Sequence, residues 1–205
     1  DFRPVCGYSG VKDKFKDYNH PEEDGVFLID MKTGKSKLIV SYDQIWNVTK
    51  ENSFTEDQKI TVNHITFNKN GTRFVMLVRN FPSKGERWRT AIVTANTDGS
   101  DLYCLSGYTY VSHYSWKDDE YLLFYMDGPY GKQLYLVSDK SSFIKPVDPD
   151  FFLEDGHCSY SPDGEWILYD SYPDTENYRN LYIYNIRKRK GITLGSYYSY
   201  PEITG

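Results

Sequence analysis

A recurring β-hairpin unit restricts what this chain can fold into more than any other feature. Each copy reads histidine, any residue, Ser or Thr, and an aromatic residue, followed by a polar turn and a hydrophobic strand. The copies begin at His64, His113 and His157. In the third copy the turn is Ser161-Pro162-Asp163-Gly164, in which Pro fixes φ, Asp bonds nearby backbone and Gly permits positive φ. A strand-based repeat of about 40–50 residues predicts the blades of a β-propeller.

Four short hydrophobic runs occur in each copy, which is typical of four-stranded antiparallel blades and unusual for a sandwich. We therefore expect an all-β fold in which residues 1–205 form a single propeller domain. The complete blades are expected at about 64–106, 113–147 and 157–195, after an incomplete blade at about 1–45, with residues 41–63 as a long connection.

The blade count predicts an incomplete ring. The chain holds about 3.5–4 blades, at the low end of what closed propellers contain. A small closed four-bladed ring is one alternative, and we favour the other, in which the chain is part of a larger ring. Open ends leave apolar blade faces uncovered, so we expect self-association through those faces.

The charge balance argues against two classes of partner. The net charge is −5 and the pI is near 5.4, whereas nucleic acids and anionic membranes require clustered Lys and Arg. The one dense basic run, at residues 187–190, falls where a hairpin turn is expected. We expect no nucleic-acid partner and no membrane partner.

Tyrosine and cysteine contents add weaker indications. Tyrosine accounts for 20 of the 205 residues, and strands and sugar-binding surfaces accommodate many aromatic rings. The three cysteines have no metal-binding spacing, and Cys104 and Cys158 fall in apolar runs typical of small buried thiols. A cytoplasmic location is favoured on this basis, with the periplasm as the alternative.

The three repeat histidines are the first candidates for chemistry. The first strand of a propeller blade is the innermost one, so His64, His113 and His157 should converge at one mouth of the central channel. Converging imidazoles can hold a divalent metal, or one of them can act as a general base. Alternatively, each histidine caps its strand by bonding a neighbouring backbone group.

Loop residues could extend a site at this mouth. Asp170, Tyr172 and Asp174 follow the second strand of the third blade and could bind a cation or sugar hydroxyls, although Asp is also a common turn residue. Arg79 and Arg89 flank the equivalent loop of the first complete blade and could bind a carboxylate, or could be solvated. The sequence contains no nucleotide-binding glycine loop, serine elbow, H-E-x-x-H or Cys-x-x-Cys motif.

Several segments resemble the oligogalacturonate lyase-like propellers across about residues 20–205. They are Asn63–Asn68 with Gly71–Phe74, and His157–Leu168 with Asp170–Asp174. The Ser-Pro-Asp-Gly turn is also shared with TolB-type and dipeptidyl-peptidase-type propellers. The preceding histidine and the following Asp-x-Tyr-Pro-Asp are the more specific features.

The resemblance implies a seven-bladed ring with a manganese ion held at the axis by histidines and a glutamine, and a histidine as base. By blade position, His157 would be a metal ligand and His113 the base, with His64 as a further candidate ligand. Metal and Arg, here Arg89, would stabilise the enolate-like charge of a β-elimination on galacturonate. The remaining metal ligands would come from later blades, which this chain does not contain.

Two functions are therefore expected. One is a metal-dependent lyase, with Mn²⁺ as cofactor, that acts on an acidic oligosaccharide and has an incomplete active site in this chain. The other is a non-catalytic propeller that binds a glycan or a protein partner at its tyrosine-rich mouth. The fold itself does not decide between them.

Overall fold

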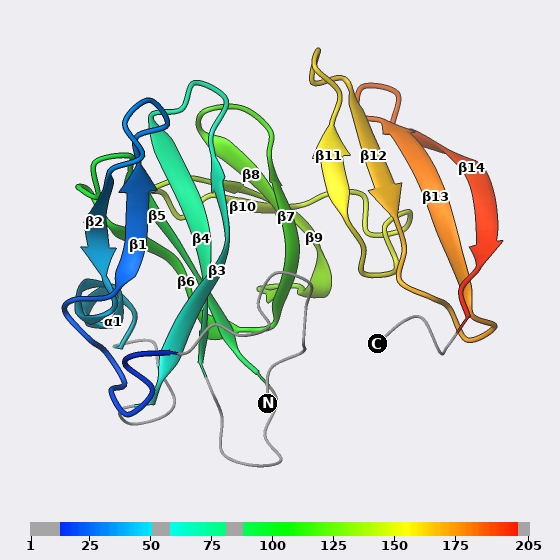
Figure 1. Ribbon diagram of the computed structural model, residues 1–205. Helices are drawn as coiled ribbons and strands as arrows, with labels where there is room; N and C mark the ends of the chain where they lie inside the picture. The colour runs from blue at the N-terminus through cyan, green and yellow to red at the C-terminus, as the bar shows by residue number, and fades with distance from the viewer. Residues whose placement is uncertain (1–12, 51–57, 81–87, 201–205) are drawn as a thin grey trace.

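The computed structural model describes residues 13–50, 58–80 and 88–200. Within these ranges the regular structure is nearly all β (Figure 1). The elements in chain order are β1 Gly25–Ile29, β2 Ser36–Ser41, α1 Tyr42–Thr49, β3 Ile60–Phe67, β4 Arg73–Asn80, β5 Thr90–Asn96, β6 Tyr103–Thr109, β7 Val111–Trp116, β8 Tyr121–Gly128, β9 Gly131–Ser138, β10 Ile144–Pro146, β11 Cys158–Tyr160, β12 Trp166–Asp170, β13 Tyr178–Asn185 and β14 Lys190–Tyr198. No helix in the described residues is long and apolar enough to cross a membrane.

The strands form four consecutive antiparallel sheets, here called blades A to D. Blade A is the hairpin β1–β2, and blades B, C and D are the four-stranded meanders β3–β6, β7–β10 and β11–β14. The blades lie side by side in chain order (Figure 1), and this is the arrangement of a partial β-propeller. The expected fold class is therefore correct.

One element was missed in the sequence. Residues 41–63 were expected to be a connection, but α1 occupies its first part. Ser41 caps the helix: its hydroxyl accepts a hydrogen bond from the Gln44 backbone N–H at 3.2 Å, and the Gln44 side chain accepts one from the Ser41 N–H at 2.9 Å. This capping box, together with the burial of Ile45 and Thr49 against blade B, stabilises a helix too short to show a clear apolar period.

The repeat histidines differ in their place on the inner strands. His157 directly precedes β11, as expected. His64 was also expected just before its strand, but β3 begins earlier, at Ile60, and His64 lies inside it with φ of 51°. His64 and His113 each fall at an irregularity in the pairing of the inner strand with its neighbour. Such bulges redirect the side chains at which they occur, here those of His64 and His113.

Apolar side chains pack in layers between neighbouring blades. On β4, Met76 packs toward blade A while Leu77 packs toward blade C, and on β8 Phe124 packs toward blade B while Leu123 packs toward blade D. Because both faces of these strands are buried, they read as continuous apolar runs. The outer blades have one such layer each.

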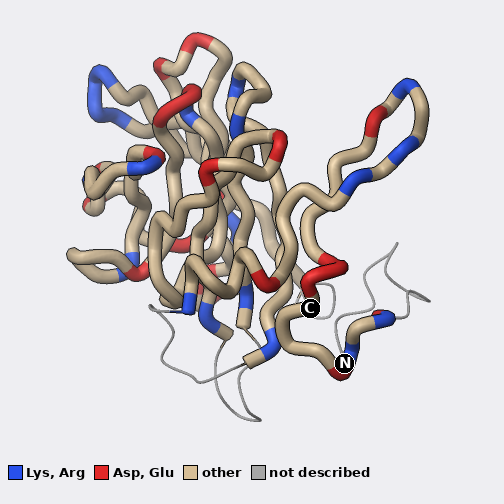
Figure 2. Tube along the Cα trace, turned by 90° about the vertical axis from the view of Figure 1, so that its left-hand side faces the viewer, with Lys and Arg blue, Asp and Glu red and all other residues tan. Residues whose placement is uncertain are grey.

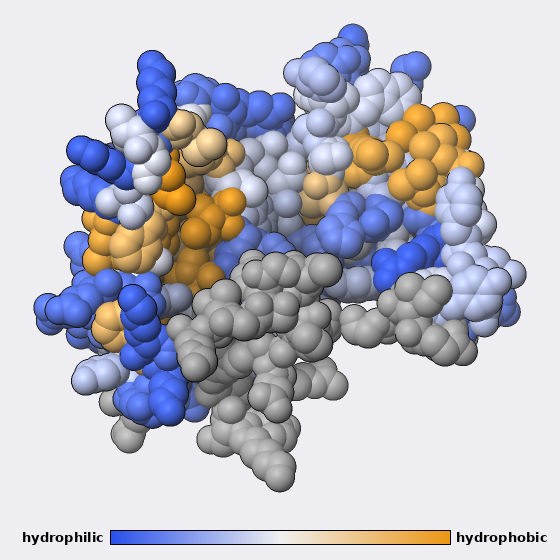
Figure 3. Space-filling model, in the orientation of Figure 1, coloured by the Kyte–Doolittle hydropathy of each residue, from blue (hydrophilic) through white to orange (hydrophobic). Residues whose placement is uncertain are grey.

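Uncovered apolar side chains occur at both ends of the row of blades (Figure 3). Phe27 and Ile29 of blade A are about half exposed, as are Leu168, Ile192 and Leu194 of blade D. In contrast, Ile167 and Tyr169 on the other face of β12 are fully buried. Self-association through these faces remains a prediction.

Candidate functional site

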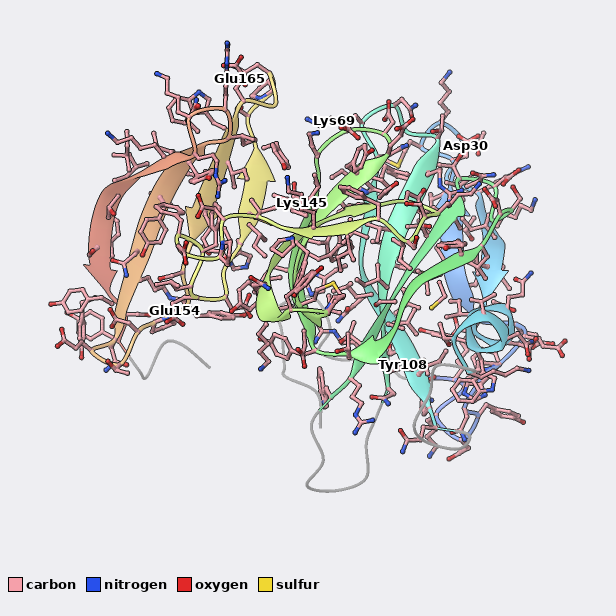
Figure 4. All side chains as sticks on the ribbon, turned by 180° about the vertical axis from the view of Figure 1, so that it is seen from behind. Asp30, Lys69, Tyr108, Lys145, Glu154 and Glu165 are labelled. Carbon is pink, nitrogen blue, oxygen red and sulfur yellow. The ribbon has the colours of Figure 1, made fainter. Side chains whose placement is uncertain are left out.

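The end of the blades where the inner strands begin is here called the histidine mouth, and the other end the turn end. Glu154 lies at the histidine mouth, whereas Lys69 and Glu165 lie in hairpin turns at the turn end (Figure 4). At the histidine mouth, His113 of blade C and His157 of blade D are neighbours. Their ring centroids are 4.0 Å apart and their planes are inclined by 58°. The prediction that successive blades bring histidines together holds for this pair.

Asp155 orients His113. It lies in the connection between β10 and β11, and its Oδ1 is 3.2 Å from His113 Nδ1. The Ser112 hydroxyl is 2.7 Å from the same nitrogen, and the Tyr110 hydroxyl donates to Asp155 Oδ2 at 2.6 Å. The imidazole is thus fixed through Nδ1, with Nε2 on the other side of the ring.

Asp155 keeps its negative charge although it is buried. Burial alone would raise its pKa, but hydrogen bonds from His113, Ser112 and Tyr110 outweigh burial and hold the pKa below the usual range. For Tyr110, burial and then the Asp155 charge raise the pKa, so that phenol stays protonated. This is the arrangement of a base and its orienting carboxylate.

Asp170 orients His157 in the same way. Both carboxylate oxygens of Asp170 are 3.0 Å from His157 Nδ1, and Oδ1 also accepts the His157 backbone N–H at 2.6 Å. His157 is the more exposed imidazole, with 62% of its side chain accessible. Both histidines therefore bond carboxylates through their rings, which differs from the backbone-capping alternative.

Tyr172 closes the outer side of the histidine pair. Its ring centroid is 5.3 Å from that of His113, and its hydroxyl oxygen is 3.5 Å from His113 Nε2. Its backbone N–H donates to the Asp155 carbonyl at 2.6 Å. The guanidinium of Arg179 lies 5.4 Å from the Tyr172 ring centroid and donates from Nε to Ser199 Oγ at 3.2 Å.

His64 and Arg79 belong to the same electrostatic neighbourhood. Partial burial, followed by the charges of Arg79, His113 and His157, lowers the pKa of His64. Arg79 Nε donates to Asn63 Oδ1 at 3.2 Å, and its guanidinium lies 5.7 Å from the Trp88 ring centroid.

Asp174 and Arg89 lie in loops that border the mouth. Asp174 Oδ1 accepts the backbone N–H groups of Glu176 and Tyr178, each at 2.9 Å, which makes it the turn residue of the loop. Arg89 directly precedes β5, its backbone N–H donates to Asn80 Oδ1 at 3.1 Å, and the residue is exposed. The structure thus gathers His113, His157, Asp170 and Tyr172 into one cluster.

The fit of these side chains to a metal ion is partial. Within the described part of the chain, no three His, Cys, Asp or Glu side chains are placed to hold an ion together. His157 does have the feature of metal-binding histidines, because a carboxylate fixes one ring nitrogen and directs the other. The described residues therefore fit one or two ligands of an ion, and not a complete set.

Three residues of this mouth were not singled out in the sequence: Tyr110, Lys132 and Arg179. Lys132 Nζ lies 4.0 Å from the Tyr110 ring centroid. Lys132 and Arg179 occupy the beginnings of the third strands of their blades, β9 and β13. The repeat register could have identified these two positions, whereas the role of Tyr110 depends on how the chain packs.

Comparisons with known proteins show the fold and no specific function. The sequence matches no family model and no curated protein. Among solved structures, TolB from Acinetobacter baumannii aligns over 82% of this chain and 37% of its own, with a TM-score of 0.50 and 16% identity. A post-proline cleaving enzyme from Rickettsia typhi aligns over 82% of this chain and 29% of its own, with a TM-score of 0.50 and 13% identity.

Both neighbours are β-propellers, so the chain has a TolB-like propeller fold. It spans about a third of the length of these structures. At such low identity the likeness concerns the fold alone, and it does not show the oligogalacturonate lyase family.

Proposed function

We propose that the histidine mouth is part of the active site of a lyase that cleaves a uronic-acid oligosaccharide by β-elimination. The observation that carries the proposal is the pair of neighbouring imidazoles, His113 and His157, each oriented by its own carboxylate. One oriented imidazole suits a base, and a second beside it suits an electrophile-binding role.

His113 is the base in this proposal. Because Asp155 occupies Nδ1, Nε2 is free of that carboxylate and can take the proton from the carbon next to the uronate carboxylate. The electron pair of the broken C–H bond forms a carbon–carbon double bond, and the bond from the neighbouring carbon to the glycosidic oxygen breaks. The Tyr172 hydroxyl, 3.5 Å from His113 Nε2, is placed to give its proton to the departing oxygen and to take in its place the proton that Nε2 removed from the substrate.

In this proposal, positively charged groups at the histidine mouth stabilise the negative charge that develops on the substrate during the elimination. His157, held by Asp170, and His64 are the side chains that would bind Mn²⁺. A bound ion would act as a Lewis acid toward the substrate carboxylate. Arg79, beside His64, supplies positive charge from this chain, and Arg89 from the adjoining loop is the second candidate.

The alternative is a non-catalytic module that binds an acidic glycan at the same mouth. It is favoured by the lack of a three-ligand metal group among the residues that the structure describes. In this case Asp155 and Asp170 hold the imidazoles as hydrogen-bonding groups for sugar hydroxyls, and no bond is broken.

The test is an elimination assay on oligogalacturonate with Mn²⁺, followed by the ultraviolet absorbance of the unsaturated product. We expect an absorbance rise that His113→Asn abolishes and that the matched variant His20→Asn leaves unchanged, because His20 stacks on Trp46. Mn²⁺ binding, measured separately by electron paramagnetic resonance, should weaken in His157→Asn. Binding of the oligosaccharide without any absorbance rise would support the non-catalytic module and reject the lyase.

A further inference from the structure

Each complete blade places one cationic side chain over one aromatic ring at the histidine mouth. Arg79 lies over Trp88 in blade B, Lys132 over Tyr110 at blade C, and Arg179 over Tyr172 in blade D. The cation-to-centroid distances are 5.7, 4.0 and 5.4 Å, respectively. We call these three the rim pairs.

The rim pairs are not copies of one sequence motif. Arg79 is at the end of a second strand, whereas Lys132 and Arg179 are on third strands. Tyr110 precedes an inner strand, and the other two rings lie in loops between second and third strands. Different positions in the three blades thus place a cation over an aromatic ring at the histidine mouth. This recurrence indicates a common binding role and not a motif inherited with the repeat.

Contacts connect two of the rim pairs to His113. Lys132 contacts Tyr110, whose hydroxyl donates to Asp155, the partner of His113. At the other nitrogen of the His113 ring, Nε2, the neighbour is the hydroxyl of Tyr172, and Arg179 contacts the Tyr172 ring.

Arg79 completes the set from blade B. Its charge contributes to lowering the pKa of His64 and its Nε donates to the neighbouring Asn63. Two rim pairs therefore adjoin the His113 network, and the third lies in the electrostatic neighbourhood of His64.

The aromatic members are accessible to a ligand. Trp88 is 47% exposed, Tyr172 40% and Tyr110 37%. The face of a sugar ring packs on such aromatic surfaces, and a cation beside the ring can bind a carboxylate. A rim pair thus matches one uronic-acid residue: ring against ring and carboxylate against cation.

Acidic side chains at the same mouth limit the kind of anion. Asp127 lies near the end of β8, and Glu154 and Asp174 lie in loops of this mouth. Along the chain, acidic and basic residues are interspersed (Figure 2). Nucleic-acid binding requires a continuous basic surface, and interspersed charges do not provide one.

We infer that the three rim pairs are subsites of one binding surface for a chain of uronic-acid residues, with one sugar residue at each pair. The chemistry of this ligand rests on the proposed function, but binding does not require that the bond be broken. The surface gives the ligand a path across blades B, C and D and past the histidine pair.

The test is calorimetric binding of an oligogalacturonate of defined length, in EDTA so that no elimination occurs. Arg79→Gln, Lys132→Gln and Arg179→Gln should each weaken binding about 3–10-fold, as expected for loss of one exposed charge-assisted contact. Lys117→Gln is the matched control, because Lys117 lies 5.2 Å from the Tyr121 ring centroid but at the turn end. This control should bind like the unaltered chain.

Three results would overturn the inference: rim variants that bind like the control, equal binding of a neutral galactose oligomer, or tighter binding of oligouridylate. The two proposals fail separately. Binding that depends on the rim pairs without absorbance rise in the elimination assay rejects the lyase and supports the surface. An absorbance rise that Lys132→Gln and Arg179→Gln leave unchanged supports the lyase and rejects the surface.

Discussion

The two ends of the blades use the same residue types in opposite ways. At the turn end, Arg73 is only 11% exposed and donates to Asp139 at 2.6 Å and to Asp101 at 3.0 Å. It also donates to Asn96 and Thr94, at 2.7 and 3.0 Å. This arginine therefore joins blade B to blade C, and its guanidinium forms its hydrogen bonds with other groups of the protein.

At the histidine mouth, Arg179 has a different environment. It donates to the Ser199 hydroxyl and lies over the exposed ring of Tyr172. The carboxylates differ likewise: Asp139 faces the permanent charge of Arg73, whereas Asp155 faces an imidazole and a phenol. A closed network of permanent charges stabilises a fold, and a group of titratable side chains open to solvent can bind and react.

The largest expected effect is at the turn end. Arg73→Met should lower the free energy of unfolding by about 3–5 kcal/mol, because it leaves Asp139 buried without its cation. Urea unfolding followed by circular dichroism measures the loss. The matched variant Arg179→Met should change stability by less than about 1 kcal/mol, since that cation is at an accessible rim. Equal losses in the two variants would remove the distinction between the ends.

Asp155→Asn should mainly affect the rate of elimination and not the stability of the fold. We expect elimination to slow about 100-fold, because the base loses the carboxylate that orients it. The control is Asp174→Asn, which alters a turn carboxylate in the adjoining loop and should keep most of the rate. The measurement is the initial rate of the absorbance rise from the unsaturated product in each variant. An unchanged rate in Asp155→Asn would exclude the role of Asp155 as the carboxylate that orients the base.

The sequence predicted the fold class, whereas the pairing of side chains in the candidate site depends on packing. The Ser161–Gly164 turn identified in the sequence does separate β11 from β12, because turn residues act locally. The histidines of the repeat were found for the same reason. However, β3 begins four residues before His64, since its first half pairs with the end of β4, which is a tertiary contact.

The pairing of Asp155 with His113 illustrates what the sequence could not supply. Asp155 is 42 residues from His113 in the chain, in a connection without periodic pattern. Its role arises only when blades C and D pack side by side. Arg179 and Lys132 become rim residues for the same reason, because their aromatic partners are specified by packing and not by spacing.

Acid should affect the histidine mouth through Asp155. Its pKa is lower in the fold than the ordinary carboxyl value, so its contribution to stability is complete above that value, near pH 4. The contribution is lost as the pH falls through the lower folded pKa. Asp155→Asn should therefore show a smaller loss of stability than the unaltered chain on going from pH 5 to pH 3, measured by urea unfolding. Parallel pH profiles would contradict the ionised carboxylate.

The smallest effect concerns the two described thiols. Burial raises the pKa of Cys104 to about 11 and that of Cys158 to about 12, so both are protonated at neutral pH. We expect neither to react with iodoacetamide at pH 7 until urea unfolds the chain, as followed by peptide mass spectrometry. Rapid labelling of Cys158 in the folded chain would contradict its place between blades C and D.

The central claim, that the histidine mouth receives an acidic oligosaccharide, can be tested on the imidazoles themselves. The chain has four histidines, and His20, stacked on Trp46 of α1 at 4.1 Å, serves as a built-in reference. Oligogalacturonate should be titrated into protein with ¹³C-labelled histidine while the ring resonances are followed by NMR. The account predicts shifts for His113 and His157 and none for His20. Unchanged His113 and His157 resonances at saturating oligosaccharide would contradict it.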